Sequence, residues 1–320
     1  MIPKPLPAPR LRHALVSLGL GLALLMDPSD AAAQHVTPVG TGADALGMGD
    51  ATTASGVGHS ALYLNPAGMA QVRIYQLTLA GSHGAQEGEW TPTISIVDSS
   101  TNEFLTAGVG YSAASADALR SDGSLSETSL LASGDRLSHH LRGGVATGYR
   151  TQSFGLYLGT SVGWTNLEIS ESDVRDYVTV DVGTIVALAN NIVRIAVVGR
   201  NLVPHDAIAD LPTQVAMGAS VMYANFLSEF DATLHFGSGD RTDDPDPPFE
   251  AVYAVGLQYA IDGILPLRLG FTHDATVDEQ RISAGLGYYT PQLMANFGYR
   301  GNLGDGSDFQ IGLDFGFNIP

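Results

Sequence analysis

This sequence of 320 residues lacks both cysteine and a long apolar run. Its most apolar stretch, ALVSLGLGLALLM at Ala14–Met26, is shorter than the about 20 residues that a helix needs to cross a bilayer. Basic residues precede this stretch and three alanines, Ala31–Ala33, follow it, which is the pattern of a secretory signal peptide. We therefore expect residues 1–33 to be removed on export. An exported chain without disulfides must be held by hydrogen bonds and packing alone.

Basic residues are also scarce, with 15 Lys and Arg against 33 Asp and Glu. Without residues 1–33 the chain keeps 12 basic and 31 acidic residues, a formal charge of −19. So acidic a chain argues against nucleic acid as a partner, because phosphates repel it. No later segment is a candidate for a membrane helix. A membrane location would therefore require a closed β-barrel, the other structure that satisfies its own backbone in lipid.

Beyond about Ile74 the sequence repeats one pattern. Segments of about ten residues alternate large apolar with small or polar side chains, and turn residues separate them, which is typical of membrane β-barrels. A soluble β-sandwich or propeller would also alternate, but we find no blade-like repeat. We therefore predict an all-β fold, an antiparallel transmembrane β-barrel of about 14 strands over residues 74–320. The strands should start near residues 74, 91, 104, 140, 153, 176, 191, 212, 227, 250, 264, 279, 292 and 307.

Apolar and charged residues keep to opposite faces of these strands. In the last one, large apolar residues alternate from Phe309 to Phe317, while Gly312 and Asp314 fall on the other face. A basic residue facing lipid at mid-bilayer costs about 2–4 kcal/mol, so we expect the charges to face the lumen. These predicted lumen charges are Arg142, Asp181, Arg194, Asp231, Arg268, Arg281 and Asp314.

The connections alternate between long and short, as the outer loops and periplasmic turns of outer-membrane barrels do. Long links are predicted at 114–139, 165–175, 200–211, 238–249, 274–278 and 301–306. An even number of strands places both termini on the periplasmic side. The longest link contains leucines that need a surface to pack on, either the rim of the barrel or a hydrophobic entry groove for a ligand. They are Leu119, Leu125, Leu130, Leu131 and Leu137.

The C-terminal strand carries a further signal. QIGLDFGF resembles the assembly signal of outer-membrane barrels, with matches at Gln310, Gly312, Phe315 and Phe317. The match ends three residues before the end of the sequence rather than at it. The resemblance implies the barrel assembly machinery as a partner and the outer membrane of a Gram-negative cell as the location.

Residues 34–73 do not follow the strand pattern. This segment is rich in glycine and alanine, which let a backbone pack closely against a wall. Within it, Asn65-Pro66-Ala67-Gly68 has the residue types of a rigid turn, because proline fixes φ and asparagine bonds to the backbone just beyond it. A segment of this kind before a barrel is suited to fold into the lumen as a plug. We predict an N-terminal hatch over residues 34–73.

The hatch motifs are similar to those of a known family. GADALGMGDATTA followed by ALYLNPAGMA resembles the N-terminal hatch of the FadL-type outer-membrane transporter superfamily (OMPP1/FadL/TodX), in which Asn-Pro-Ala is a hallmark. The same combination also resembles the PorV/PorQ branch, whose members are associated with type IX secretion. The motif match covers about 40 residues, and the branch stays open. The shorter chain and loops argue against an elaborate external lipid-capture site.

Other motifs are weighed against their surroundings. GTSVG around Ser161 matches the nucleophile-elbow string, but it lies inside a predicted strand rather than in a strand–turn–helix context. The acidic link DDPDPPFE could hold calcium, although its prolines more simply stiffen a solvated loop. His139 and His140 at a loop–strand junction could bind a metal or be hydrated. We predict no enzyme activity, no cofactor and no metal site.

The resemblance implies passive uptake of hydrophobic small molecules such as long-chain fatty acids, with outer-membrane lipids around the barrel. The alternative is a PorV-like, non-transporting adaptor that binds secretion-system proteins. The lumen should discriminate between them. A transporter needs an apolar path beside the hatch, whereas an adaptor can be plugged by the lumen charges paired across the barrel.

Overall fold

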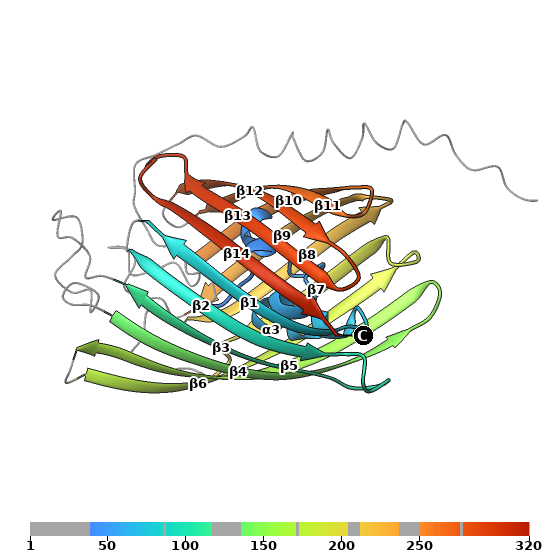
Figure 1. Cartoon of the computed structure of the whole chain (residues 1–320), viewed down its shortest axis with the longest axis horizontal. Coiled ribbons are helices and arrows are strands. Elements are labelled where there is room, and N and C mark those ends of the chain that lie inside the picture. Colours follow the sequence, from blue (N-terminus) through green and yellow to red (C-terminus); the bar gives the residue numbers. More distant parts are fainter. Residues whose placement is uncertain are drawn as a thin grey trace, which may run out of the picture.

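The computed structural model describes residues 39–85, 88–116, 136–170, 173–203, 212–236, 250–275 and 278–319. They form a closed barrel around two short helices, α2 (Ala43–Gly47) and α3 (Gly58–Leu64), and a 3-10 turn, η1 (Pro66–Ala70) (Figure 1). The strands are β1 (Tyr75–Gly84), β2 (Glu89–Asp98), β3 (Thr106–Ala116), β4 (Arg136–Arg150), β5 (Phe154–Ser170), β6 (Asp173–Leu188), β7 (Val193–Arg200), β8 (Thr213–Tyr223), β9 (Phe226–Phe236), β10 (Glu250–Ile261), β11 (Leu265–Asp274), β12 (Glu279–Tyr289), β13 (Leu293–Asn302) and β14 (Phe309–Asn318).

Every strand pairs antiparallel with its neighbours in sequence, and β14 pairs with β1 to close the sheet. The closing register joins Leu77 to Phe317 and Leu79 to Phe315. The prediction of a closed antiparallel barrel of about 14 strands is confirmed. We call the end where β1 begins and β14 ends the terminus end, and the opposite end the loop end. Closure leaves the sheet without free edges along its paired length.

Each predicted strand start lies within four residues of the observed one. The predicted link 165–175 is wrong, because β5 continues to Ser170 and β6 begins at Asp173. Leu137 also lies in a strand rather than in a loop, where it pairs with Ser115 of β3 and with Glu168 of β5. These strands therefore extend further toward the loop end than their apolar alternation indicates.

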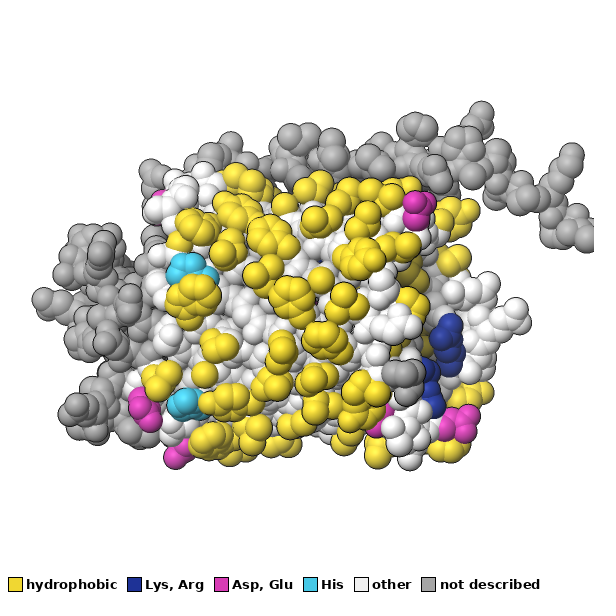
Figure 2. Space-filling model, in the orientation of Figure 1, with side chains coloured by type: hydrophobic (Ala, Val, Ile, Leu, Met, Phe, Trp, Pro, Cys, Tyr) yellow, Lys and Arg dark blue, Asp and Glu magenta, His cyan; other side chains and the backbone are white. Residues whose placement is uncertain are grey.

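The outer face of the barrel is apolar. In β14, Leu313, Phe315 and Phe317 are exposed while Gly312 and Asp314 are buried, which is the predicted split. Figure 2 shows apolar side chains spread over the outer face, with charged side chains near the two ends. A belt of this kind meets the requirement for contact with lipid chains. In the described part of the chain, no helix is both long and apolar enough to cross a membrane.

Residues 39–73, which we call the inner segment, lie inside the barrel except for Val72 and Arg73, which are exposed just before β1 (Figure 1). Helix α2 contacts β11 to β14 and β1, α3 contacts β1 to β4, and η1 contacts β3 to β6. Nearly all side chains between Ala43 and Met69 are buried. Residues 1–38 lie outside the described residues, so the predicted signal peptide and the first residues of the predicted hatch remain predictions.

Candidate functional site

The Asn65 side chain builds the predicted turn within the inner segment. Its Nδ2 donates to the Thr53 carbonyl at 2.9 Å, and its Oδ1 accepts from the Ala67 amide at 3.2 Å. Pro66 stands at the start of η1, where its missing N–H costs nothing. Gln71 adds two bonds to the Ala54 and Gly56 carbonyls, at 3.1 and 3.0 Å. The turn therefore fastens the second half of the inner segment to the first.

Carboxylates of the barrel wall hold the first half of the inner segment. The Ala43 amide donates to both oxygens of Asp314 at 2.8 Å, and the Thr53 amide donates to Asp231 at 2.9 Å. Glu229 accepts from the Ala54 and Ser55 amides, at 2.5 and 3.1 Å. All three side chains are buried, and breaking a buried hydrogen bond leaves an unsatisfied polar group at a cost of about 1–3 kcal/mol, so these side chains are firm anchors.

Apolar packing holds the second half of the inner segment. Ala61, Leu62, Tyr63 and Met69 form one buried cluster with Val97 of β2 and Ala146 of β4. A second cluster joins Ala67, together with Ala54 at the end of the first half, to wall residues of β5, β6 and β7, which are Tyr157, Ile185, Ala187 and Ala196. The lumen beside η1 is thus lined by apolar contacts rather than by charges.

Inward-facing glycines let the inner segment lie directly on the wall backbone. A Cβ atom at Gly159 would overlap the backbone of Pro66 and Ala67, and one at Gly270 would overlap the backbone of Met48. Further glycines that face the inner segment are Gly108, Gly110, Gly144, Gly183, Gly218, Gly256, Gly285, Gly298 and Gly312. The glycine content of the strands therefore reflects a requirement for space inside the barrel, in addition to any role in turns.

The predicted lumen charges lie on the inner face, but they do not pair across the barrel as a set. Arg142 and Asp181 form an ion pair, the only one between two of these seven residues in the described chain. Arg268 donates to Gln258 and Asn296, at 2.8 and 3.0 Å. The buried Nε of the Arg194 side chain has no hydrogen-bond partner among the described residues.

The other predicted lumen charges belong to two different groups. Asp231 and Asp314 hold amides of the inner segment, as described above. Arg281 lies at the loop end, where it pairs with Glu279 and, at 3.1 Å, with Asp308.

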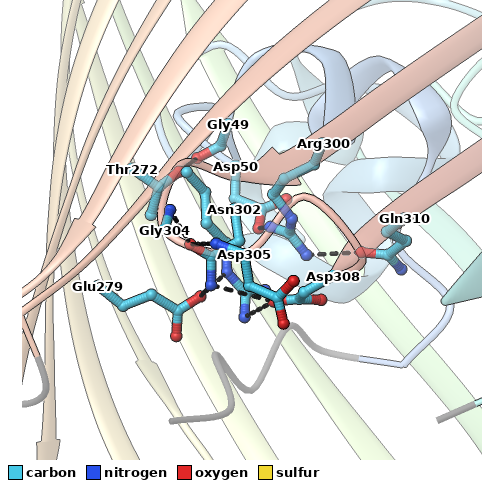
Figure 3. A network of polar contacts seen from close by, with 11 residues as sticks. Gly49, Asp50, Thr272, Glu279, Arg300, Asn302, Gly304, Asp305, Asp308 and Gln310 are labelled. Atoms are coloured by element: carbon cyan, nitrogen blue, oxygen red, sulfur yellow. Dashed lines mark hydrogen bonds and ion pairs between the residues drawn. The ribbon is translucent and has the colours of Figure 1, made fainter. Parts of the chain in front are cut away.

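A polar network at the loop end ties β11 to β14 to the inner segment. Figure 3 shows Arg300 between Asp50 of the inner segment and Gln310 of β14, with the Gln310 oxygen 2.7 Å from the guanidinium. Thr272 donates to the Gly49 carbonyl at 2.8 Å. Asn302 bridges Glu279 and Asp308 with bonds of 3.0 and 3.3 Å. This network adds a charged anchor next to the carboxylate anchors.

The fold can be compared with known structures. No protein-family model matches the sequence, and no curated protein matches it. The P. putida toluene transporter TodX aligns with a TM-score of 0.58 at 13% identity, over 88% of this chain and 99% of that chain. The Ralstonia pickettii toluene transporter TbuX gives 0.61 at 11% identity, over 88% and 99%. A Pseudomonas aeruginosa FadL homologue gives 0.57 at 12% identity, over 89% and 99%.

This chain has the FadL-type barrel fold. At these identities the likeness establishes the fold alone, so the role of each residue in this FadL-type barrel must be argued from its own contacts.

The remaining predicted residues are the leucines of the predicted link 114–139 and the residues of the predicted assembly signal. Leu119, Leu125, Leu130 and Leu131 lie outside the described residues, whereas Leu137 is on the exposed face of β4. Gln310, Gly312, Phe315 and Phe317 all lie in β14, so the structure gathers the predicted assembly signal on one strand next to the closing seam. Its role in assembly stays a prediction.

The motifs set aside on sequence grounds can also be located. Ser161 lies inside β5 and donates to Asp181 at 3.1 Å, so it does not stand on a nucleophile elbow. His139 and His140 lie within β4 and face opposite sides of it, where they bond Tyr111 and Thr165 respectively. The acidic link at 238–249 lies outside the described residues. Within the described chain no cluster of potential metal ligands is present.

Sequence reasoning missed several anchors. Glu229 stands on the polar side of a predicted strand, as Asp231 does, so the alternation alone could have included it. Asp50 and Arg300 have no sequence signal that joins them. His59 is buried and bonds Ser95 of β2 at 2.7 Å. Burial lowers the pKa of His59 to about 4, so the imidazole is neutral at pH 7.

Proposed function

We propose that this protein is an outer-membrane channel through which hydrophobic small molecules pass by diffusion. The observation that carries the proposal is an apolar interface inside a closed barrel, between the second half of the inner segment and strands β2 to β7. A water-filled porin would have no use for such an interface, because its solutes are polar. The fold shared with proteins described as toluene transporters supports the same class of solute.

Long-chain fatty acids are the finer proposal for the ligand, and it rests on the resemblance of the hatch motifs. The proposed location is the outer membrane, with both termini in the periplasm. Assembly there would use the barrel assembly machinery through Gln310, Gly312, Phe315 and Phe317. We propose no enzymatic step, cofactor or metal.

Equilibrium binding tests this proposal. The purified protein in lipid nanodiscs should bind a fluorescent long-chain fatty acid, or labelled toluene, saturably. Nanodiscs with an unrelated polar porin are the control for partition into lipid. Saturable binding of toluene without that of the fatty acid would retain the channel and reject the fatty-acid ligand. Absence of saturable binding by either ligand would contradict the proposal.

The leucines of the longest link are the proposed site of first contact. Leu130→Ser with Leu131→Ser removes two apolar contacts, each worth about 1.5–3 kcal/mol when fully buried. Fatty-acid binding should weaken while thermal unfolding stays unchanged, because the sequence predicts a loop at these two positions and a loop lies outside the hydrogen-bonded wall. Leu265→Ser with Leu267→Ser, on the outer face of β11, is the matched control and should leave binding unchanged. Unaltered binding in the loop variant would reject this entry site.

A PorV-like adaptor of type IX secretion is the second candidate. The observation that favours it is the anchoring of the inner segment by buried side chains of the wall, because a permanent plug needs such anchors. They are Glu229, Asp231, Asp314 and Arg300. An adaptor would bind secretion-system proteins and carry no solute. Co-purification of a secretion component, together with absent ligand binding, would select it.

A further inference from the structure

The two halves of the inner segment are bound to opposite sides of the barrel by different forces. Residues 43–55 are held on β9 to β14 by buried hydrogen bonds and one ion pair: the side chains of Asp314, Asp231 and Glu229 accept from backbone amides, and Arg300 pairs with Asp50. These partners are almost fully buried. Breaking them would leave carboxylates and amides unsatisfied in a confined space, which is costly.

Residues 58–70 face β2 to β7 without any charged bond to the wall among the described residues. Their hydrogen bonds to the wall are neutral: one joins His59 and Ser95 at 2.7 Å, and one joins Tyr63 and Ser112 at 3.4 Å. The Tyr63 ring also lies under the guanidinium of Arg142, which is paired with Asp181. The rest is apolar packing of Leu62 and Met69 on Val97 and Ala146, with glycines behind them. An apolar solute can replace such contacts with equivalent ones, because dispersion and burial are not directional.

This asymmetry identifies a route. We propose that an apolar solute passes between residues 61–70 and the wall of β2 to β7, while residues 43–55 stay bound to β9 to β14. The inference rests on the proposed function and specifies the side of the lumen that opens. The proposed solute is apolar. The guanidinium beside Tyr63, that of Arg142, is already paired with Asp181, so it is not available to bind a charged group on the solute.

Tyr63 stands at the loop-end side of this route. Its ring lies under the Arg142 guanidinium, 5.8 Å from the ring centroid, and its hydroxyl reaches Ser112. Both wall residues are nearer the loop end of their strands than Val97 and Ala146, the wall members of the apolar cluster. A solute that enters from the loop end therefore meets the Tyr63 ring before it reaches Val97 and Ala146.

The absence of native cysteine allows a direct test with two matched tethers. The Ala70 Cβ lies 3.6 Å from an ideal Cβ at Gly148 of β4, and the Ala43 Cβ lies 3.4 Å from one at Gly312 of β14. Both separations are close to the roughly 3.5–4.5 Å of disulfides. The variants are Ala70→Cys with Gly148→Cys, and Ala43→Cys with Gly312→Cys. Each variant is studied oxidised and after reduction, so that it serves as its own control for assembly and folding.

The measurement is uptake of radiolabelled long-chain fatty acid, and of toluene, into outer-membrane vesicles from a host without its own FadL-type protein. The oxidised 70–148 tether should reduce uptake to the level of vesicles without the protein, and reduction should restore it. The oxidised 43–312 tether should leave uptake at the wild-type level. Equal blockage by both tethers, or blockage by the 43–312 tether alone, would overturn the route.

Failure of the proposed function looks different, since wild type itself would then show no uptake.

A Cβ at Gly148 would come within 2.6 Å of the Tyr157 ring, which could prevent assembly of that variant. Tyr63→Ala then keeps the route testable, because it removes the ring at the entrance. Its uptake should exceed that of wild type, whereas Phe230→Ala on the outer face should not change uptake. Equal uptake by Tyr63→Ala and wild type would overturn the route.

Discussion

At the scale of single residues, the inner segment is held by hydrogen bonds to residues close in sequence and by hydrogen bonds to distant ones. The Asn65 turn was predictable because Pro66 and Ala67, which form it, follow Asn65 directly in sequence. The anchor that joins Ala43 to Asp314 crosses 271 positions. Alternation places Asp314 on the inner face, but it does not specify which amide the carboxylate meets there.

Asn65→Ala with Pro66→Ala should loosen the inner segment and leave the barrel intact. The change removes the bonds to Thr53 and Ala67, and an unsatisfied buried group costs about 1–3 kcal/mol. Protease cleavage within residues 40–70 should therefore accelerate, while the heat-modifiable mobility of the barrel on gels stays normal. Cleavage at the wild-type rate would contradict the role of this turn.

His59 should make the inner segment sensitive to acid. Its pKa in the fold is about 4, below the ordinary value of about 6.5, so the unfolded chain binds more protons between these values. Stability is then lost as the pH falls from about 6.5 to about 4, by at most on the order of 3 kcal/mol. As the pH is lowered over this range, protection of residues 40–70 from protease should decrease less steeply in His59→Gln than in wild type. Identical pH profiles would show that His59 does not contribute.

At the scale of elements, period-2 alternation located every strand but underestimated three of them. Strands β4, β5 and β6 contain 15, 17 and 16 residues. The alternation fades near Asn166 and Glu168 because outward side chains there are polar. Backbone pairing continues past this point, since hydrogen bonds between strands do not require an apolar face. The lipid belt is therefore shorter than the hydrogen-bonded wall.

The closing strand should be the most sensitive element. Phe315→Asp with Phe317→Asp places two charges on the exposed face of β14, beside Leu79 and Leu77 of β1. Each charge costs up to a few kcal/mol, depending on its depth in the membrane. The variant should lack the heat-modifiable, detergent-resistant form on gels. Phe315→Leu with Phe317→Leu, which keeps the exposed face of β14 apolar, is the control. Normal heat modification of the aspartate variant would contradict the membrane register.

At the scale of the whole molecule, the barrel follows from the sequence more directly than its function does. Alternation, the short apolar leader and the scarcity of charge on one face together predict a membrane barrel. Which solutes pass through the lumen depends on the contacts between the inner segment and the barrel wall. Those contacts join Met69 to Gly144 and Glu229 to Ala54, pairs that no local pattern relates. The choice between channel and adaptor therefore needs a measurement of passage.

The most direct measurement is solute entry into outer-membrane vesicles, whose saccharide layer excludes apolar solutes that phospholipid bilayers pass. Vesicles with and without this protein would be compared for a radiolabelled long-chain fatty acid, toluene and a disaccharide. We expect the protein to accelerate entry of an apolar solute, with saturation, and to leave disaccharide entry unchanged. Equal acceleration of the disaccharide, or no acceleration of either apolar solute, would contradict it.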